Sequence, residues 1–198
     1  MPNIDVMTKP IDTKTALLDA AEQVARARGH DGFSYADLSE VVGIRKASIH
    51  HHFASKADLI AALMKRYRER VEAHYATIDA QSASGGERLE GFLDMHRDAV
   101  NGSKTLCLCV ALAMGRDGLT PDVQRDIAAF RAMTFDWLAS VFEAGAADGT
   151  IAAPNDPAQE GPATLALAEG AQVSARAEGD MSRFEAAVAG LRARIKPL

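Results

Sequence analysis

The sequence predicts an all-α protein of about nine helices, with a three-helix helix-turn-helix head near the N-terminus and a helical body after it. Three observations support this fold class. Alanine is abundant and runs of β-branched residues are scarce, which favours helix over strand. Apolar residues recur at helical spacing, and no segment alternates convincingly with a period of two. Capping residues, prolines and glycines divide the chain into segments of helical length.

The head is expected to hold three helices. The first covers Thr13–Arg28, where apolar residues recur at helical spacing. Ser34 begins the second helix, and Asp37, three residues later, completes a capping box. Gly43 ends that helix, and a third short helix follows over about residues 45–52.

The body is expected to hold the remaining helices. Ser55 and Asp58 repeat the capping signature and open a long helix whose apolar stripe ends near Ile78. A loop covers residues 81–86. Proline at the first helical position marks two further helix starts, at Pro121 and Pro157. The later helices are predicted over residues 87–100, 104–114, 121–147, 157–178 and 181–194.

The composition bounds the class of protein. A chain of 198 residues with 25% charged and 47% apolar residues is typical of a globular protein with one large domain or two small ones. Cys107 and Cys109 are too close together to form a disulfide framework, which favours the reducing cytoplasm. The longest apolar run, residues 106–114, is about half of a bilayer span, so no membrane partner is expected. No signal peptide is expected, and residues 1–10 are interpreted as a loose arm.

Charge is distributed unevenly along the chain. The formal net charge is −5, but residues 41–70 hold seven Lys or Arg against Asp58 and Glu69. This window therefore carries +5 and the remainder −10. A basic patch on an acidic body is typical of a protein that docks DNA with one end. A merely solvated helix face is an equally good explanation of the charge alone.

Residues 37–53 carry the decisive pattern, two short helices joined at a glycine. Gly43 can supply the positive φ of a tight turn, and the small Ser39 lets the second helix approach the first. Ile49, six residues after Gly43, is placed to fill the angle between the helices. The second helix would enter a major groove of DNA with its N-terminal residues at the base edges. The side chains predicted to face solvent on it are Arg45, Lys46, Ser48 and His51.

This run resembles the TetR family of transcriptional regulators. Apolar residues surround the turn glycine in Val42-Gly43-Ile44, the short helix ends in His50-His51-His52-Phe53, and Ser55-Lys56 follows. The resemblance covers about residues 13–65. It departs from the family at Ser39, where alanine is commoner, and at Ala54, where proline is commoner.

The resemblance implies a function and a division of the chain. Residues 1–54 would be the arm and DNA-binding domain, and residues 55–198 the effector-binding and dimerisation domain. The protein would be a homodimeric repressor that binds a palindromic operator in double-stranded DNA and is released by a small molecule. Release would be a population shift in which the effector favours a state with the long helix after Ser55 displaced.

The resemblance also implies a set of DNA contacts. The family reads bases with the start of its third helix and holds phosphates with flanking residues. By position, the base contacts fall to Lys46, Ala47 and Ser48, preceded by Arg45, and the phosphate contacts to Ser34, Tyr35, His51 and Lys56. His50 is included as a contact, although it stands where the family usually has tyrosine. Phe53 is expected in the core.

Histidine and cysteine leave alternatives open. Neighbouring helical residues diverge by about 100°, so His50, His51 and His52 cannot converge on one metal ion, and neither a metal nor another cofactor is predicted. Cys107 and Cys109 are either core residues or, through Cys107, a sensor of oxidants or electrophiles. A zinc site at these thiols would need further ligands, with His96 the close candidate. An enzyme using Cys107 and His96 as nucleophile and base is disfavoured.

An effector pocket is predicted among Met, aromatic and His side chains of the body helices. Such a pocket would suit a mainly apolar ligand with one polar or anionic group. Most of these residues are expected to be core rather than ligand contacts. The candidates are Met64, Tyr67, His74, Phe92, Met95, His96, Cys107, Met114, Phe130, Met133 and Trp137.

The last two helices are poor in large residues. Gly170, Ala171, Ala175 and Ala187 would let helices approach closely. Two such helices from each of two subunits would form a four-helix dimer interface. Packing within one chain would explain the same residues.

Overall fold

The computed structural model describes residues 12–152 and 156–198, so the arm predicted for residues 1–10 lies outside the described residues. The described residues form nine α-helices, one short 3-10 helix and no strand, apart from an isolated bridge between Ile151 and Ile195. The all-α prediction is confirmed. The elements are α1 (Thr13–Arg28), α2 (Tyr35–Val42), α3 (Lys46–His52), α4 (Lys56–Gln81), α5 (Gly85–Ala99), α6 (Leu108–Ala113), η1 (Arg116–Gly118), α7 (Pro121–Asp148), α8 (Pro157–Glu178) and α9 (Ser182–Arg192).

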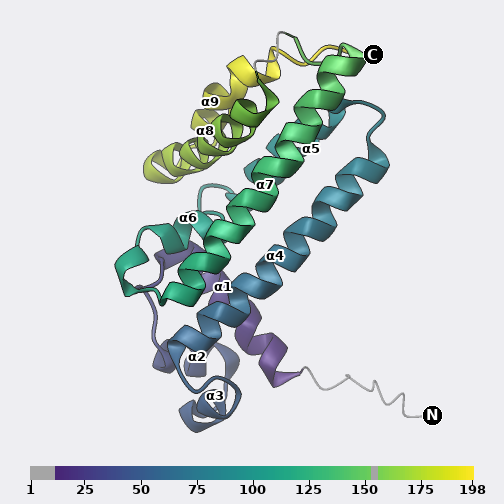
Figure 1. Cartoon of the computed structure of the whole chain (residues 1–198). Helices are drawn as coiled ribbons and strands as arrows, with labels where there is room; N and C mark the ends of the chain where they lie inside the picture. The colour runs from purple at the N-terminus through teal and green to yellow at the C-terminus, as the bar shows by residue number, and fades with distance from the viewer. Residues whose placement is uncertain (1–11, 153–155) are drawn as a thin grey trace, which may run out of the picture.

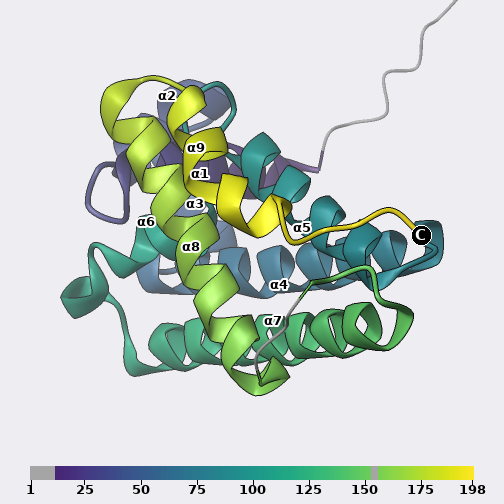
Figure 2. The same ribbon diagram turned by 90° about the horizontal axis from the view of Figure 1, so that it is seen from above.

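Two long helices connect the ends of the molecule (Figure 1). The head, made of α1, α2 and α3, lies at one end, and α4 and α7 both run from it toward the other end. Helix α5 packs against both of them, and α8 runs across α7 with α9 beside it (Figure 2). Aromatic side chains fill the centre, where Tyr75 of α4 stacks on Trp137 of α7 at 4.2 Å between ring centroids. Phe92 of α5 packs against both rings.

Helix α5 begins two residues before the predicted start. The Ser84 side chain accepts a hydrogen bond from the Glu87 backbone N–H and caps the helix at Gly85. Gly85 lies against α7, where an added Cβ would come within 2.1 Å of the Gly145 nitrogen. The glycines that suggested a loop are therefore helical residues that allow a close helix approach.

The helix predicted over residues 104–114 is wrong in its first turn. Asn101, Gly102 and Ser103 have φ of 47°, 60° and 68°, and α6 starts only at Leu108. The intervening backbone bonds to distant groups: the Leu106 N–H donates to the Arg26 carbonyl at 3.0 Å. These tertiary hydrogen bonds replace the helical ones that local propensity predicts.

The C-terminal segment closes the far end of the body. The Ala152 N–H donates to the Arg194 carbonyl at 2.7 Å, and the Lys196 N–H donates to the Thr150 carbonyl at 2.8 Å. Ala171 and Ala175, predicted for a dimer interface, are buried within the chain, whereas Gly170 is exposed. None of the helices in the described ranges could cross a membrane.

Candidate functional site

The turn between α2 and α3 has the geometry that the sequence predicts. Gly43 lies in the left-handed region at φ 73° and ψ 31°, and its N–H donates to the Ser39 carbonyl at 3.0 Å. The Ser39 hydroxyl also donates to the Ile44 carbonyl at 2.5 Å, a bond that alanine could not make. Ile49 and Leu38 are fully buried between the helices, so the predicted role of Ile49 is confirmed.

A capping box holds the N-terminus of α2 at the surface. The exposed Ser34 accepts hydrogen bonds from the N–H groups of Ala36 and Asp37, and Asp37 accepts from the Ser34 N–H at 2.6 Å. These bonds with Ser34 lower the pKa of Asp37. The next side chain, Tyr35, turns inward and donates to the Phe53 carbonyl at 3.0 Å. Burial raises the pKa of Tyr35 to about 12, so its hydroxyl remains a donor within the head.

Helix α3 presents most of its side chains to solvent. Ile49 is the buried anchor, and Ser48 is half-buried. A shallow groove lies between α3 and the start of α1, lined in part by Thr13, Ser48 and His51. The face that would meet DNA is therefore accessible, and its contacts stay predictions. The exposed residues of this face are Arg45, Lys46, Ala47, His50 and His51.

Lys56 has partners within the chain that the sequence did not suggest. Its ammonium donates to the carbonyls of His30 at 2.5 Å and Phe33 at 2.7 Å, and lies 4.3 Å from the centroid of the Phe33 ring. Burial lowers the pKa of Lys56, against the opposing effect of Asp31 and Asp37. One of its three N–H groups is left for the predicted phosphate contact.

The three histidines of α3 point to different surroundings. His50 packs edge-on to Tyr35 at 4.9 Å, and its Nδ1 lies 3.2 Å from the Ala54 carbonyl. His51 and His52 contact each other in a T-shaped arrangement at 5.4 Å. Over residues 12–152 and 156–198, no group of three or more potential ligands could hold a metal ion.

The body contains a cavity of about 240 Å³ between α4 and α5, next to the end of α1. Of the predicted pocket residues, Tyr67, His74, Met95 and His96 line it. The sequence missed the other lining residues, although the spacing of Glu22 and Arg26 by four positions on one helix was a usable signal. These others are Arg26, Arg70, Val71, Asp98 and Ala99.

The remaining predicted pocket residues do not line this cavity. Phe92 and Met64 are packed in the core with at most 1% exposure. Trp137 donates from Nε1 to Asp79 at 3.0 Å while stacked on Tyr75, and Met114 is 83% exposed. Apart from Met114, these residues use their apolar surface for packing between helices. The predicted residues outside the cavity are Met64, Phe92, Cys107, Met114, Phe130, Met133 and Trp137.

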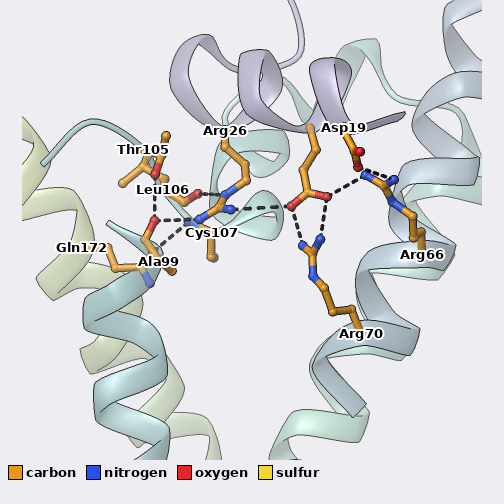
Figure 3. Close-up of polar contacts among 10 residues, drawn as sticks. Asp19, Arg26, Arg66, Arg70, Ala99, Thr105, Leu106, Cys107 and Gln172 are labelled. Carbon is orange, nitrogen blue, oxygen red and sulfur yellow. Dashed lines mark hydrogen bonds and ion pairs between the residues drawn. The ribbon is translucent and has the colours of Figure 1, made fainter. Parts of the chain in front are cut away.

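A network of charged side chains joins the head to the body beside this cavity. Arg66 and Arg70 project from α4 toward α1 (Figure 3). Glu22 of α1 accepts from Arg70 through both oxygens, one of them at 3.0 Å, and from Arg66 at 3.1 Å. Arg26 lies 3.6 Å from the same carboxylate. Burial opposes ionisation of Glu22, but the arginines, led by Arg70, hold its pKa below the usual range.

Arg26 also anchors the irregular segment before α6 (Figure 3). Its Nε donates to the Leu106 carbonyl at 2.8 Å, and its Nη2 donates to the Ala99 carbonyl at 2.7 Å. The fully buried Gln172 of α8 accepts from the Cys107 N–H and donates to the His96 carbonyl, both at 2.9 Å. These bonds connect α1, α5 and α8 around one end of the cavity.

The two cysteines are buried free thiols. Burial raises the pKa of Cys107 to about 12, which makes the reactive thiolate scarce at neutral pH. The Cys107 sulfur accepts from the Val110 N–H at 3.4 Å. The buried Nε2 of His96 has no hydrogen-bond partner among the described residues. The geometry favours the core interpretation of both thiols.

Comparison with known proteins gives consistent results. The family model described as bacterial regulatory proteins, tetR family, matches residues 17–63. A TetR-family regulator structure from Agrobacterium tumefaciens is 33% identical, with 93% of this chain and 98% of that chain covered and a TM-score of 0.87. A TetR regulator structure from Legionella pneumophila is 26% identical, with 95% and 100% covered and a TM-score of 0.85.

A curated relative matches over a shorter region. The transcriptional repressor KstR2 of Mycobacterium tuberculosis is 30% identical over 84 residues. The match spans 42% of this chain and 42% of the length of that repressor.

The exposed α3 and the glycine turn before it, next to a helical body, define a helix-turn-helix regulator of transcription. The chain belongs to the TetR family. The family consists of transcriptional regulators, and the relatives reported above are named as regulators or repressors.

Proposed function

We propose that the chain is a homodimeric repressor that binds a palindromic operator and is released by a small-molecule effector. Residues 1–54 serve as the DNA-binding domain and residues 55–198 as the effector-binding and dimerisation domain. Membership of the TetR family and the name of the KstR2 repressor support this proposal. The proposal places the protein in the cytoplasm, in keeping with two cysteines that are free thiols.

The observation that carries the DNA-binding proposal is the exposed first turn of α3. Arg45, Lys46 and Ala47 are exposed there, while Ile49 anchors the helix from below. A recognition helix held in this way can enter a major groove without disturbing its own packing. Arg and Lys at this position can donate to guanine, and the capped N-terminus of α2 can face a phosphate.

Dimerisation through α8 and α9 is supported by their outer surface. Leu167 is 36% exposed and Val173 is 45% exposed on α8. A shallow groove runs between the two helices, lined among others by Leu167, Ala187 and Gly190. Paired head domains would place two recognition helices about one DNA turn apart, which explains the expected palindrome.

The test is retention of genomic DNA fragments by the purified protein, followed by affinity measurements on a retained fragment. Lys46→Ala should weaken binding by roughly 10- to 100-fold, the usual effect of losing a base contact. Lys104→Ala is the charge-matched control, because Lys104 is exposed in the body and far from α3 in sequence. Lys56→Ala should reduce the salt dependence of binding if the predicted phosphate contact is made. Retention of no specific fragment, or equal affinities for Lys46→Ala and Lys104→Ala, would contradict the proposal.

A further inference from the structure

The cavity beside α1 has a wall that is partly apolar and partly cationic. Tyr67, Val71 and Met95 supply apolar surface, and two guanidinium groups complete the lining on the side of the head. Arg26 reaches the cavity from α1, and Arg70 reaches it from α4. The Arg70 side chain is 51% exposed, so a ligand can approach it from solvent.

The charge around this wall is not balanced. Arg26, Arg66 and Arg70 share two carboxylates, Glu22 and Asp19, which leaves one positive charge in excess. The remaining acid of the cavity is Asp98, and Arg97 pairs with it at 3.3 Å. A guanidinium carries five N–H donors, so Arg70 keeps donors after it has bound both oxygens of Glu22.

A second, independent feature indicates a ligand at the same place. His96 lines the cavity and is 5% exposed, yet its Nε2 has no hydrogen-bond partner among the described residues. An unpaired buried polar atom destabilises the folded chain, and a ligand atom that pairs with it removes that penalty. Burial also lowers the pKa of His96 to about 4, so the ring is neutral and can pair with a polar group without adding charge.

We propose that this cavity binds a small organic carboxylate and that the ligand competes with Glu22 for Arg70. The carboxylate accepts from Arg70 and Arg26, the apolar part lies against Tyr67, Val71 and Met95, and a polar atom pairs with His96. A cavity of about 240 Å³ lies just below the usual size range of ligand pockets and so fits a small molecule. The inference rests on the proposed function in treating this ligand as the effector.

Competition with Glu22 connects the ligand to the DNA-binding head. Glu22 belongs to α1 of the head, and Arg70 belongs to the part of α4 that extends into the body. A second carboxylate on Arg70 weakens its attraction to Glu22 and so loosens the contact between α1 and α4. By reciprocity, any state with a tighter Arg70–Glu22 pair binds the ligand less well.

Titration calorimetry on the full chain tests the proposal with matched acid–amide pairs. The probes are 4-hydroxybenzoate with 4-hydroxybenzamide and 6-hydroxyhexanoate with 6-hydroxyhexanamide, which carry a hydroxyl that can pair with His96 and differ within each pair in charge and little in shape. At least one acid should bind ten-fold or more tightly than its amide. Arg70→Gln should lose this preference, and Lys65→Gln, which removes an exposed charge of α4 outside the cavity lining, should retain it.

The Glu22→Gln variant distinguishes competition for Arg70 from a general loss of folding stability. The amide removes the competing anion while keeping the shape of the side chain, so acid binding should become several-fold tighter. A destabilised or misfolded variant would instead bind more weakly. No preference for either acid over its amide, an unchanged preference in Arg70→Gln, or weaker binding in Glu22→Gln would each overturn the proposal.

Operator retention without ligand provides the separate readout for the proposed function. A protein that retains specific DNA but shows no acid preference disproves only the carboxylate inference. A protein that binds the acid through Arg70 but retains no DNA disproves the repressor proposal and leaves the cavity assignment standing.

Discussion

Gln172 shows how one buried side chain can determine the structure of an irregular segment. It is fully buried on α8, and its amide bonds to the Cys107 N–H and the His96 carbonyl. An apolar residue of similar size would leave both backbone groups without these partners. The segment before α6 therefore depends on a residue 65 positions away in the sequence.

We expect Gln172→Leu to lower the free energy of unfolding by about 2–4 kcal/mol, because two buried backbone groups lose their partners. Urea unfolding at fixed protein concentration measures this loss. Ser174→Ala, at an exposed position of the same helix, should change stability by less than about 0.5 kcal/mol. Equal stabilities of the two variants would show that the bonds of Gln172 contribute little.

His96 should make stability depend on pH. Burial lowers its pKa from 6.5 to about 4 in the folded chain, so the unfolded chain binds its proton first. Stability is therefore lost as the pH falls from about 6.5 to about 4, by up to roughly 3 kcal/mol. Urea midpoints measured across this range should fall more steeply for the native sequence than for His96→Gln.

The His96→Gln comparison isolates one group. Glu22 is present in both proteins, so its contribution cancels in the difference between the two curves. Glutamine keeps a polar side chain at the cavity but takes up no proton in this range. Parallel pH profiles would contradict the assignment of a neutral, desolvated imidazole to the folded state.

At the scale of elements, the joint between α2 and α3 depends on backbone conformation rather than on space. Gly43 has a positive φ of 73°, and no atom lies within 4 Å of the position of an added Cβ. A substitution there meets no neighbour and is penalised only by its own conformational preference. This turn sets the position of α3 relative to α2, so it affects the DNA-binding face directly.

Gly43→Ala should therefore destabilise the protein by about 1 kcal/mol, and Gly43→Asn by less, because asparagine tolerates the left-handed region better. Thermal unfolding of both variants checks the order. A larger loss for asparagine than for alanine would indicate a steric conflict that the free space around Gly43 excludes.

At the scale of the whole molecule, fewer basic residues are available to bind DNA than the sequence of residues 41–70 suggests. Residues 41–70 hold seven Lys or Arg, but Arg66 and Arg70 pair with acids of α1, and Lys56 binds two carbonyls. These three cations serve mainly to join the head to the body. Of the four other basic residues, Arg45 and Lys46 lie at the exposed start of α3, and Lys65 and Arg68 lie on α4.

The proposed dimerisation through α8 is also a property of the whole molecule. Leu167→Arg should convert the dimer to monomer at micromolar concentration, because it places a charge on the proposed interface between two copies of α8. Sedimentation velocity measures the change, and operator affinity should fall with it. Met114→Arg is the matched control, since Met114 is an exposed apolar residue on another element. A Leu167→Arg protein that stays dimeric would place the interface elsewhere.

The head could be predicted almost completely from its sequence. The capping box at Ser34, the turn at Gly43 and the buried Ile49 were all predicted and are all observed. Their interactions join residues within a few positions of one another, so a short stretch of sequence contains both partners. The fold class could be predicted for the same reason, since helical periodicity and caps are local signals.

Tertiary structure alone decided the cavity, the irregular segment before α6 and the inward role of Lys56. Arg70 and Glu22 are 48 positions apart, and Arg26 and Leu106 are 80 positions apart. Local patterns carry no information on which distant group satisfies a buried charge or carbonyl. Most of the predicted pocket residues became core for the same reason, because helix packing determines which apolar side chains lie at a cavity and which fill the space between helices.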